Sequence, residues 1–218
     1  MTIDGNPAHE EASNDVTAEV TMEALMESAP NLEKTWAELQ SHGLEPDVDL
    51  VCEGGFTFRV HQRYLRLAST HFESELSSEK RHRSKVVIDA SPEVTIKMLE
   101  FIYTGAVEER QGFRVSRDLL KVGFDYGIPD LKTRMSAVLS KYINLRNVVS
   151  LTSLGYRYQA ATLRHQGVRY MANHFDALEA HDPEWHTKLE PNLAALVRRR
   201  AHFHRDISAR ASPTRRFL

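Results

Sequence analysis

Alternating apolar and polar residues predict three short strands in the first half of the chain. Residues 47–52 form an apolar run with β-branched members, and residues 56–60 alternate in a way typical of a strand with one buried and one solvated face. Between them, Glu53–Gly55 predicts a tight hairpin turn, because glycine tolerates the positive φ that such turns need. A third strand is expected over residues 85–89.

The pattern changes to helical spacing after residue 60, and two short helices are expected over residues 61–69 and 70–76. A longer helix begins at the Ser91-Pro92 pair and carries Met98, Leu99, Ile102 and Tyr103 on one side. It ends at Gly105. Residues 106–115 are charged and irregular, so we expect a surface loop there, followed by helices over residues 117–126 and 128–142.

An internal repeat follows these helices. Val122-Gly123-Phe124-Asp125-Tyr126 is echoed by Leu154-Gly155-Tyr156-Arg157-Tyr158, at an offset of 32 residues (155 − 123). A repeat of this length is typical of stacked helical hairpins that cannot bury their apolar faces alone. We therefore expect a second hairpin over residues 147–178, with the two repeated glycines allowing close approach of the helices.

Before the first strand, apolar residues recur at steps of four and three, which indicates an amphipathic helical stripe. Its members are Leu25, Ala29, Leu32, Trp36 and Leu39. Pro30 is expected to break the stripe, with Asn31 as the N-cap of the second part. A helix this short is marginal alone in water and must dock on another surface.

Charge is distributed unevenly along the chain, although the net charge is only −2. Residues 1–33 contain eight acidic residues and no Lys or Arg, whereas residues 198–218 contain seven arginines and one acid. We expect a disordered acidic leader over residues 1–20 and a basic C-terminal tail over residues 201–218. The tail is interpreted first as solvated and second as a nuclear import signal. Its arginines lack interleaved aromatic residues, which argues against nucleic-acid binding.

Composition argues against several functions. The single cysteine, Cys52, lies in a predicted buried strand and is interpreted as a small packed hydrophobe, with no disulfide framework or cysteine-rich metal site. No apolar run is long enough to span a membrane, and no signal peptide is present, so nuclear and/or cytoplasmic localisation is expected. P-loop, GxSxG, GxGxxG and HExxH motifs are absent, so we expect neither an enzyme nor a cofactor. The His202-Phe203-His204 cluster is interpreted as ordinary surface histidines.

Taken in order, the segments DVDLVCEGGFTFRVH, YLRLASTHFESEL, KVVIDASPEV, LEFIYTG and DYGIPDLK resemble a BTB/POZ domain over residues 47–142. The chain is most similar to the C-terminal half of speckle-type POZ proteins, including the 3-box and the start of a BACK domain over residues 147–200. No counterpart of their MATH domain precedes residue 47. The resemblance implies an α+β fold in which helices cap a small sheet, followed by an α-helical hairpin extension.

Homodimerisation and cullin-3 binding without catalysis are what the resemblance implies for function. In such dimers the helix before the first strand packs across the two-fold axis. Within residues 21–43 this assigns Leu32, Trp36 and Leu39 to the dimer interface, opposite Tyr64 and Ala68. The alternative is that this helix covers the core of its own domain.

For cullin-3, the resemblance implies a grip by the second core helix and the loop after it. The expected contact residues are Phe72, Leu76, Ser77, Ser78 and Tyr126. Ser78 stands where an acid is expected, with Glu79 one residue late, which would weaken binding by roughly ten-fold. Phe72 and Tyr126 are equally consistent with core positions.

Other functions remain open from the sequence. The domain could serve as a dimeric scaffold or transcriptional co-factor without ubiquitin, or form a heterodimer with related BTB proteins. In BTB transcription factors an acid before the first strand pairs with a base after the histidine; here Asp47 matches the acid, but Gln62 replaces the base. That difference, and the absence of zinc fingers, count against the transcription-factor version.

Overall fold

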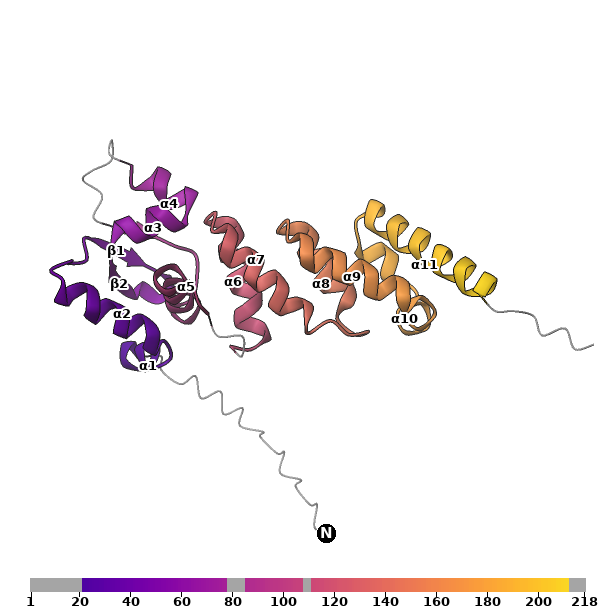
Figure 1. Cartoon of the computed structure of the whole chain (residues 1–218), viewed down its shortest axis with the longest axis horizontal. Coiled ribbons are helices and arrows are strands. Elements are labelled where there is room, and N and C mark those ends of the chain that lie inside the picture. Colours follow the sequence, from indigo (N-terminus) through magenta and orange to yellow (C-terminus); the bar gives the residue numbers. More distant parts are fainter. Residues whose placement is uncertain (1–20, 78–84, 108–110, 212–218) are drawn as a thin grey trace, which may run out of the picture.

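The computed structural model describes residues 21–77, 85–107 and 111–211, with side chains up to residue 203. It contains a small sheet with helices on it, followed by a row of helices that extends away from the sheet (Figure 1). The elements are α1 (Met22–Glu27), α2 (Pro30–Ser41), β1 (Val48–Val51), η1 (Glu53–Gly55), β2 (Thr57–Val60), α3 (Gln62–Ala68), α4 (Thr70–Glu75), β3 (Lys85–Val87), α5 (Pro92–Thr104), α6 (Phe113–Asp125), α7 (Pro129–Ser140), α8 (Val148–Arg157), α9 (Ala161–Asn173), α10 (Phe175–His181), η3 (Trp185–Lys188) and α11 (Pro191–Ala211).

The sheet has the strand order β2-β1-β3, with β1 antiparallel to β2 and parallel to β3. The predicted hairpin is confirmed, but its connection is a three-residue 3₁₀ turn, closed by the N–H of Cys52 donating to the carbonyl of Phe56 at 2.9 Å. Buried and exposed residues alternate along β2, as expected for a strand with one solvated face. The buried side chains of the sheet enter one continuous core with α5.

Helix α5 lies at the centre of this core, and seven consecutive residues of it, 94–100, are buried. Two of them are charged. Lys97 Nζ lies 3.2 Å from Glu100 Oε2 and also donates to the carbonyl of Ser28, while the amide of Asn31 lies 3.5 Å from Glu100 Oε1. A buried charge is tolerated only when it is paired. This pair therefore fixes the α1–α2 region on α5, and Asn31 does not act as the N-cap that the sequence suggested, because Ala29 occupies that position.

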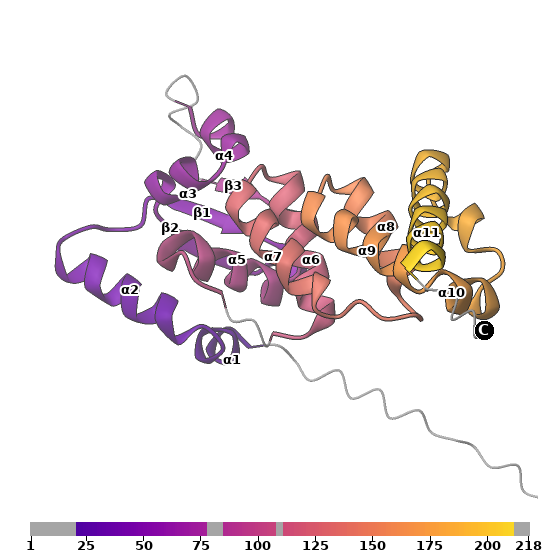
Figure 2. The same ribbon diagram turned by 45° about the vertical axis from the view of Figure 1, so that its right-hand side comes forward.

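Helices α6 to α9 form the two stacked hairpins that the repeat predicts (Figure 2). The two glycines are confirmed as points of close helix approach. A Cβ at Gly123 would lie 2.9 Å from the backbone nitrogen of Lys132, and one at Gly155 would lie 2.7 Å from that of Arg164. Lys132 and Arg164 are themselves 32 residues apart (164 − 132). The repeat therefore covers both members of each contact.

Helix α11 stands where the repeat would place the second helix of a third hairpin. A shift of 32 residues carries residues 161–173, which form α9, onto residues 193–205 of α11. It packs on α9 as α9 packs on α7. The predicted boundary between extension and basic tail at residue 201 is wrong, since the helix continues to Ala211. Its buried stripe of Leu193, Val197 and Ala201 crosses that boundary, and the next helix-breaking residue is Pro213.

One further difference from the sequence expectation concerns the end of a segment. The predicted loop over residues 106–115 ends early, because α6 begins at Phe113 and already buries Val115. None of the described helices is both long and apolar enough to cross a bilayer.

The repeated glycine contact is testable with Gly155→Ala. In an unconstrained helix this substitution stabilises by about 1 kcal/mol, but here the new methyl group meets backbone, and overpacking of this kind costs about 1 to 3 kcal/mol. We expect urea denaturation to show a net loss of stability. Ser150→Ala, on the exposed side of the same helix, serves as the control and should change stability by less than about 0.5 kcal/mol. Unchanged or increased stability of Gly155→Ala would contradict the close packing of α8 on α9.

Candidate protein-interaction surfaces

Helix α4 is joined to the turn between α6 and α7 by a set of contacts that we call the junction. The hydroxyl of Ser69 donates to the carbonyl of Tyr126 and accepts from the N–H of Phe72 at 3.0 Å. The N–H of Thr70 donates to the carbonyl of Gly127 at 3.3 Å. Gly127 has φ +59°, and a Cβ there would collide with the Thr70 hydroxyl, so this position requires glycine.

Tyr126 is the side chain at the middle of the junction. Its ring stacks on Phe72 with centroids 5.6 Å apart and meets the edge of His71 at 5.1 Å. Its hydroxyl accepts from the N–H of Asp89 at 2.6 Å, and the Asp89 carboxylate pairs with Lys121 at 3.0 Å. Burial raises the pKa of Tyr126, so the tyrosine is a neutral structural group at physiological pH.

Of the residues expected to contact cullin-3, the four that the structure describes lie at or near this junction, and none of them is fully exposed. Phe72 is 0% exposed and Leu76 is 5% exposed, because both point into the core under α4. Ser77 and Tyr126 are partly buried. Ser78 lies outside the described residues. Phe72 and Leu76 therefore support this surface from the core side. Direct contact of either residue with a partner stays a prediction, and the single chain does not expose their side chains for it.

Accessible positions lie instead along what we call the binding edge, formed by α4, the α6–α7 turn and the α8–α9 turn. Figures 1 and 2 both show α4 and these two turns in a row on one side of the molecule. The row is continuous, because Phe124 contacts Tyr158 with ring centroids 5.6 Å apart. Its exposed members are His71, Glu73, Ser74, Asp125, Gln159, Ala161 and Thr162.

The two turns of the binding edge share one backbone geometry. Gly127 and Gln159 are 32 residues apart and both have positive φ, +59° and +50°. The first turn needs glycine because α4 abuts it, whereas the second has no such neighbour and carries an exposed glutamine. Gln159 was not among the surface positions predicted from the sequence. Extending the 32-residue repeat by one position, from Tyr126 and Tyr158 to Gly127 and Gln159, would have found it.

A second surface is built around Tyr103. Tyr64 stacks on its ring at 4.6 Å and Trp36 meets it edge-on at 5.8 Å. The Tyr103 hydroxyl accepts from the N–H of His61 at 2.8 Å and lies 2.8 Å from His61 Nδ1, while His61 Nε2 lies 3.3 Å from the carbonyl of Leu44. The tautomer that satisfies these contacts carries its proton on Nε2. His61 thus has a structural role, linking Tyr103 to the backbone at Leu44.

The residues assigned to the dimer interface lie near this aromatic cluster. Trp36, Leu39, Tyr64 and Ala68 are partly buried, and the first three pack against the core of their own chain. Leu32 is fully buried within the single chain, so in this arrangement it is a core residue and offers no surface to a partner. Next to Ala68, Leu67 is 78% exposed, an apolar side chain that the sequence analysis did not single out.

Asp47 and Gln62, the pair that replaces the charged pocket of the transcription factors, bind each other. The N–H of Gln62 donates to Asp47 Oδ1 and its side-chain amide donates to Oδ2, both at 2.7 Å. The carboxylate therefore caps the N-terminus of α3, where an anion is favoured.

The described residues offer little that resembles catalytic or metal chemistry. Within them, no three or more His, Cys, Asp or Glu side chains converge as metal ligands would. Cys52 is buried, and that burial raises the pKa of its thiol, which makes it unreactive and consistent with a packed hydrophobe.

Comparison with known families identifies the first half of this structure. Residues 37–143 match the family model of the BTB/POZ domain. This segment, just under half of the chain, is thus similar to the BTB/POZ family, and the match begins ten residues before the boundary predicted at residue 47. Domains of this class bind other proteins, so the chain carries a protein-interaction module, in a class that is generally non-catalytic.

Curated proteins that are named for a POZ or BTB domain are similar to this chain over more than 60% of its length. TD and POZ domain-containing protein 5 of Mus musculus is 26% identical over 156 residues, which cover 70% of this chain and 45% of that protein. BTB and MATH domain-containing protein 40 of Caenorhabditis elegans is 25% identical over 153 residues, covering 62% and 38%. The chain thus spans less than half of the length of these relatives. The solved BTB domain of zebrafish PATZ1 is 22% identical, with 56% of this chain and 99% of that one covered at a TM-score of 0.42.

Burial of Tyr103 predicts a loss of stability at high pH. Desolvation raises the pKa of Tyr103 to about 12 from its ordinary value of about 10. Because the folded pKa is the higher one, this contribution is fully present below pH 10 and is lost as the pH rises from about 10 to about 12, amounting to about 2 to 3 kcal/mol. Urea denaturation at pH 9 and pH 11.5 measures it. Tyr103→Phe should lose less stability between the two pH values, and equal losses in both proteins would contradict the assignment.

Proposed function

We propose that the protein is a homodimeric interaction module that acts as an adaptor for a cullin-3 type ubiquitin ligase, with a 3-box and partial BACK extension like that of speckle-type POZ proteins. The observation that carries this proposal is the binding edge. It joins the helix of the BTB/POZ domain that the resemblance assigns to cullin-3 with the turns of both downstream hairpins. A partner that requires the domain and its extension together would find both on one continuous surface.

Dimerisation is supported by the second surface. Trp36, Leu39, Tyr64 and Ala68 combine apolar bulk with partial exposure, and Leu67 on the same helix is largely solvated. Burial of such side chains by a partner contributes roughly 25 cal/mol per Å² of apolar area, against the entropy cost of association. A two-fold dimer that pairs these helices is the commonest symmetric solution.

The test is isothermal titration of the full chain with the N-terminal domain of cullin-3, with the mass of each protein checked by light scattering. A Leu76 variant is unsuitable, because Leu76 is buried and its replacement reports on folding. Glu73→Arg is exposed on α4 and should weaken binding at least ten-fold, about 1.4 kcal/mol or more. Glu23→Arg makes the same charge change on α1, which lies far from α4 in both views, and should bind as the natural chain does.

Each outcome has a definite meaning. Submicromolar binding by a particle of twice 24.9 kDa, lost in Glu73→Arg alone, supports the adaptor function. A well-folded dimer that releases no heat would exclude it and favour a scaffold that acts without cullin-3. A monomeric particle would refute the dimer surface. Equal weakening of cullin-3 binding by Glu73→Arg and Glu23→Arg would mean that the contact with cullin-3 does not lie on α4.

A further inference from the structure

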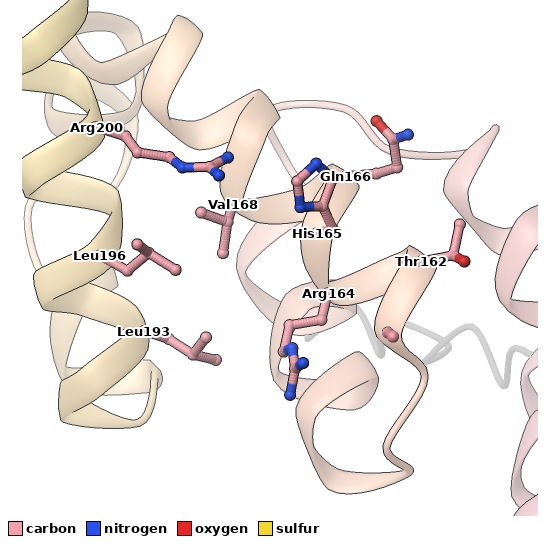
Figure 3. A pocket seen from close by; sticks show the side chains of 9 residues that line it. Thr162, Arg164, His165, Gln166, Val168, Leu193, Leu196 and Arg200 are labelled. Atoms are coloured by element: carbon pink, nitrogen blue, oxygen red, sulfur yellow. The ribbon is translucent and has the colours of Figure 1, made fainter.

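A groove separates α9 from α11 at the far end of the helical extension from the sheet. Its volume is about 500 Å³, within the range of ligand-binding clefts. Figure 3 shows Leu193, Leu196 and Arg200 projecting from α11 toward α9, with Arg164 and Val168 on the facing side. The floor is apolar and the rim is basic. The sequence expectation of a 3-box-like extension does not include this feature.

The positive charge of the groove is uncompensated within the part of the chain that the structure describes. Arg164, His165 and Arg200 line it, and no Asp or Glu is among the lining residues. No ion pair joins either arginine to a carboxylate of the described residues. Guanidinium groups bind carboxylates in a bidentate manner, and their attraction is stronger beside an apolar surface than in open water.

A second basic groove, lined mainly by α8 and by residues between His181 and Lys188, differs in this respect. It is lined by Arg146, Arg157 and Lys188, but also by Asp182, whose carboxylate pairs with Lys188 at 2.7 Å. Its charge is partly neutralised from within. The α9–α11 groove is therefore the better candidate for an acidic ligand, and the second groove provides a matched control.

We propose that the α9–α11 groove binds an acidic segment of a partner protein, in which one or two large apolar side chains lie between Asp or Glu residues. The apolar side chains occupy the floor over Val168, Leu193 and Leu196, and the carboxylates pair with Arg164 and Arg200. The groove adjoins the end of the binding edge, since Ala161 and Thr162 belong to both. It would thus serve to recruit a second protein beside the first, and it does not depend on that first partner being cullin-3.

The acidic residues at the N-terminus of the same chain are poorly placed to fill this groove. From α1 to α9 the packed helices run through α5, α6 and α7, which amounts to about 32 to 40 Å for four helix pairs at 8 to 10 Å each, and the groove lies beyond α9 on the side of α11. Glu10 is eleven residues from Thr21, and an extended stretch of that length reaches about 36 to 40 Å. Of the five acidic residues before Thr21, only Asp4 is separated from it by a stretch of chain clearly longer than the distance to the groove.

The test pans a phage library of random twelve-residue peptides against the full chain and measures the enriched peptides by fluorescence anisotropy. We expect enrichment of sequences with Asp or Glu around Leu, Ile or Phe. Arg164→Glu/Arg200→Glu should weaken their binding at least ten-fold, while the control Arg146→Glu/Arg157→Glu leaves it unchanged. Circular dichroism and light scattering verify that both double variants keep the fold and the particle mass.

Several results would overturn the proposal. The first is enrichment of peptides without an acidic bias, and the second is equal binding of the peptides to both double variants. The third is binding of a synthetic peptide of residues 1–20 with the same arginine dependence, while the library shows no acidic enrichment. That third result would assign the groove to the chain's own N-terminus. Loss of cullin-3 binding in Arg164→Glu/Arg200→Glu would place cullin-3 itself in the groove. Retained cullin-3 binding, with acidic peptides lost, separates this proposal from the adaptor function.

Discussion

The junction between α4 and the α6–α7 turn is the contact on which the rest of the structure depends. It is made of backbone and short side chains: the Ser69 hydroxyl on the Tyr126 carbonyl, the Thr70 N–H on the Gly127 carbonyl, and a glycine where any Cβ would strike Thr70. Such a contact has little room to adjust, because backbone atoms cannot move aside as a long side chain can. Helix α4 and the α6–α7 hairpin, two parts of the BTB/POZ segment, are thereby held in a single arrangement, and the later helices stack on it through the contact of α7 with α9.

The arrangement explains how one surface can draw on both parts of the chain. The repeat places a second turn, with Gln159 at the same left-handed position, one step along from the first. At the first turn α4 covers the backbone, and at the second the turn is open to solvent. Where the repeat continues into α11, the helices leave a groove, and its basic rim gives the far end of the row a different chemistry from the near end. Partner binding along the edge and in the groove would share only Ala161 and Thr162, where the two surfaces adjoin.

Features set by local sequence were predictable, and those set by tertiary packing were not. The strands, the start of α5 at its Ser-Pro pair and the contacts of Gly123 and Gly155 follow from periodicity and residue type. Resemblance could place Phe72 and Leu76 on the second core helix but could not tell which way they point, since a six-residue helix shows too few turns to define its buried face. The length of α11 was missed because its arginines suggested a solvated tail, while Val197 and Ala201 continue the apolar stripe between them.

The central claim is that the BTB/POZ segment and its helical extension form one binding edge. Hydrogen exchange of the full chain, measured by mass spectrometry with and without the N-terminal domain of cullin-3, tests it most directly, because exchange reports protection segment by segment. The account predicts slower exchange in α4, in residues 125–130 and in residues 157–162 together, with α1 unchanged. Protection confined to α4, or found on α1 and α2 while both turns exchange as before, would contradict it.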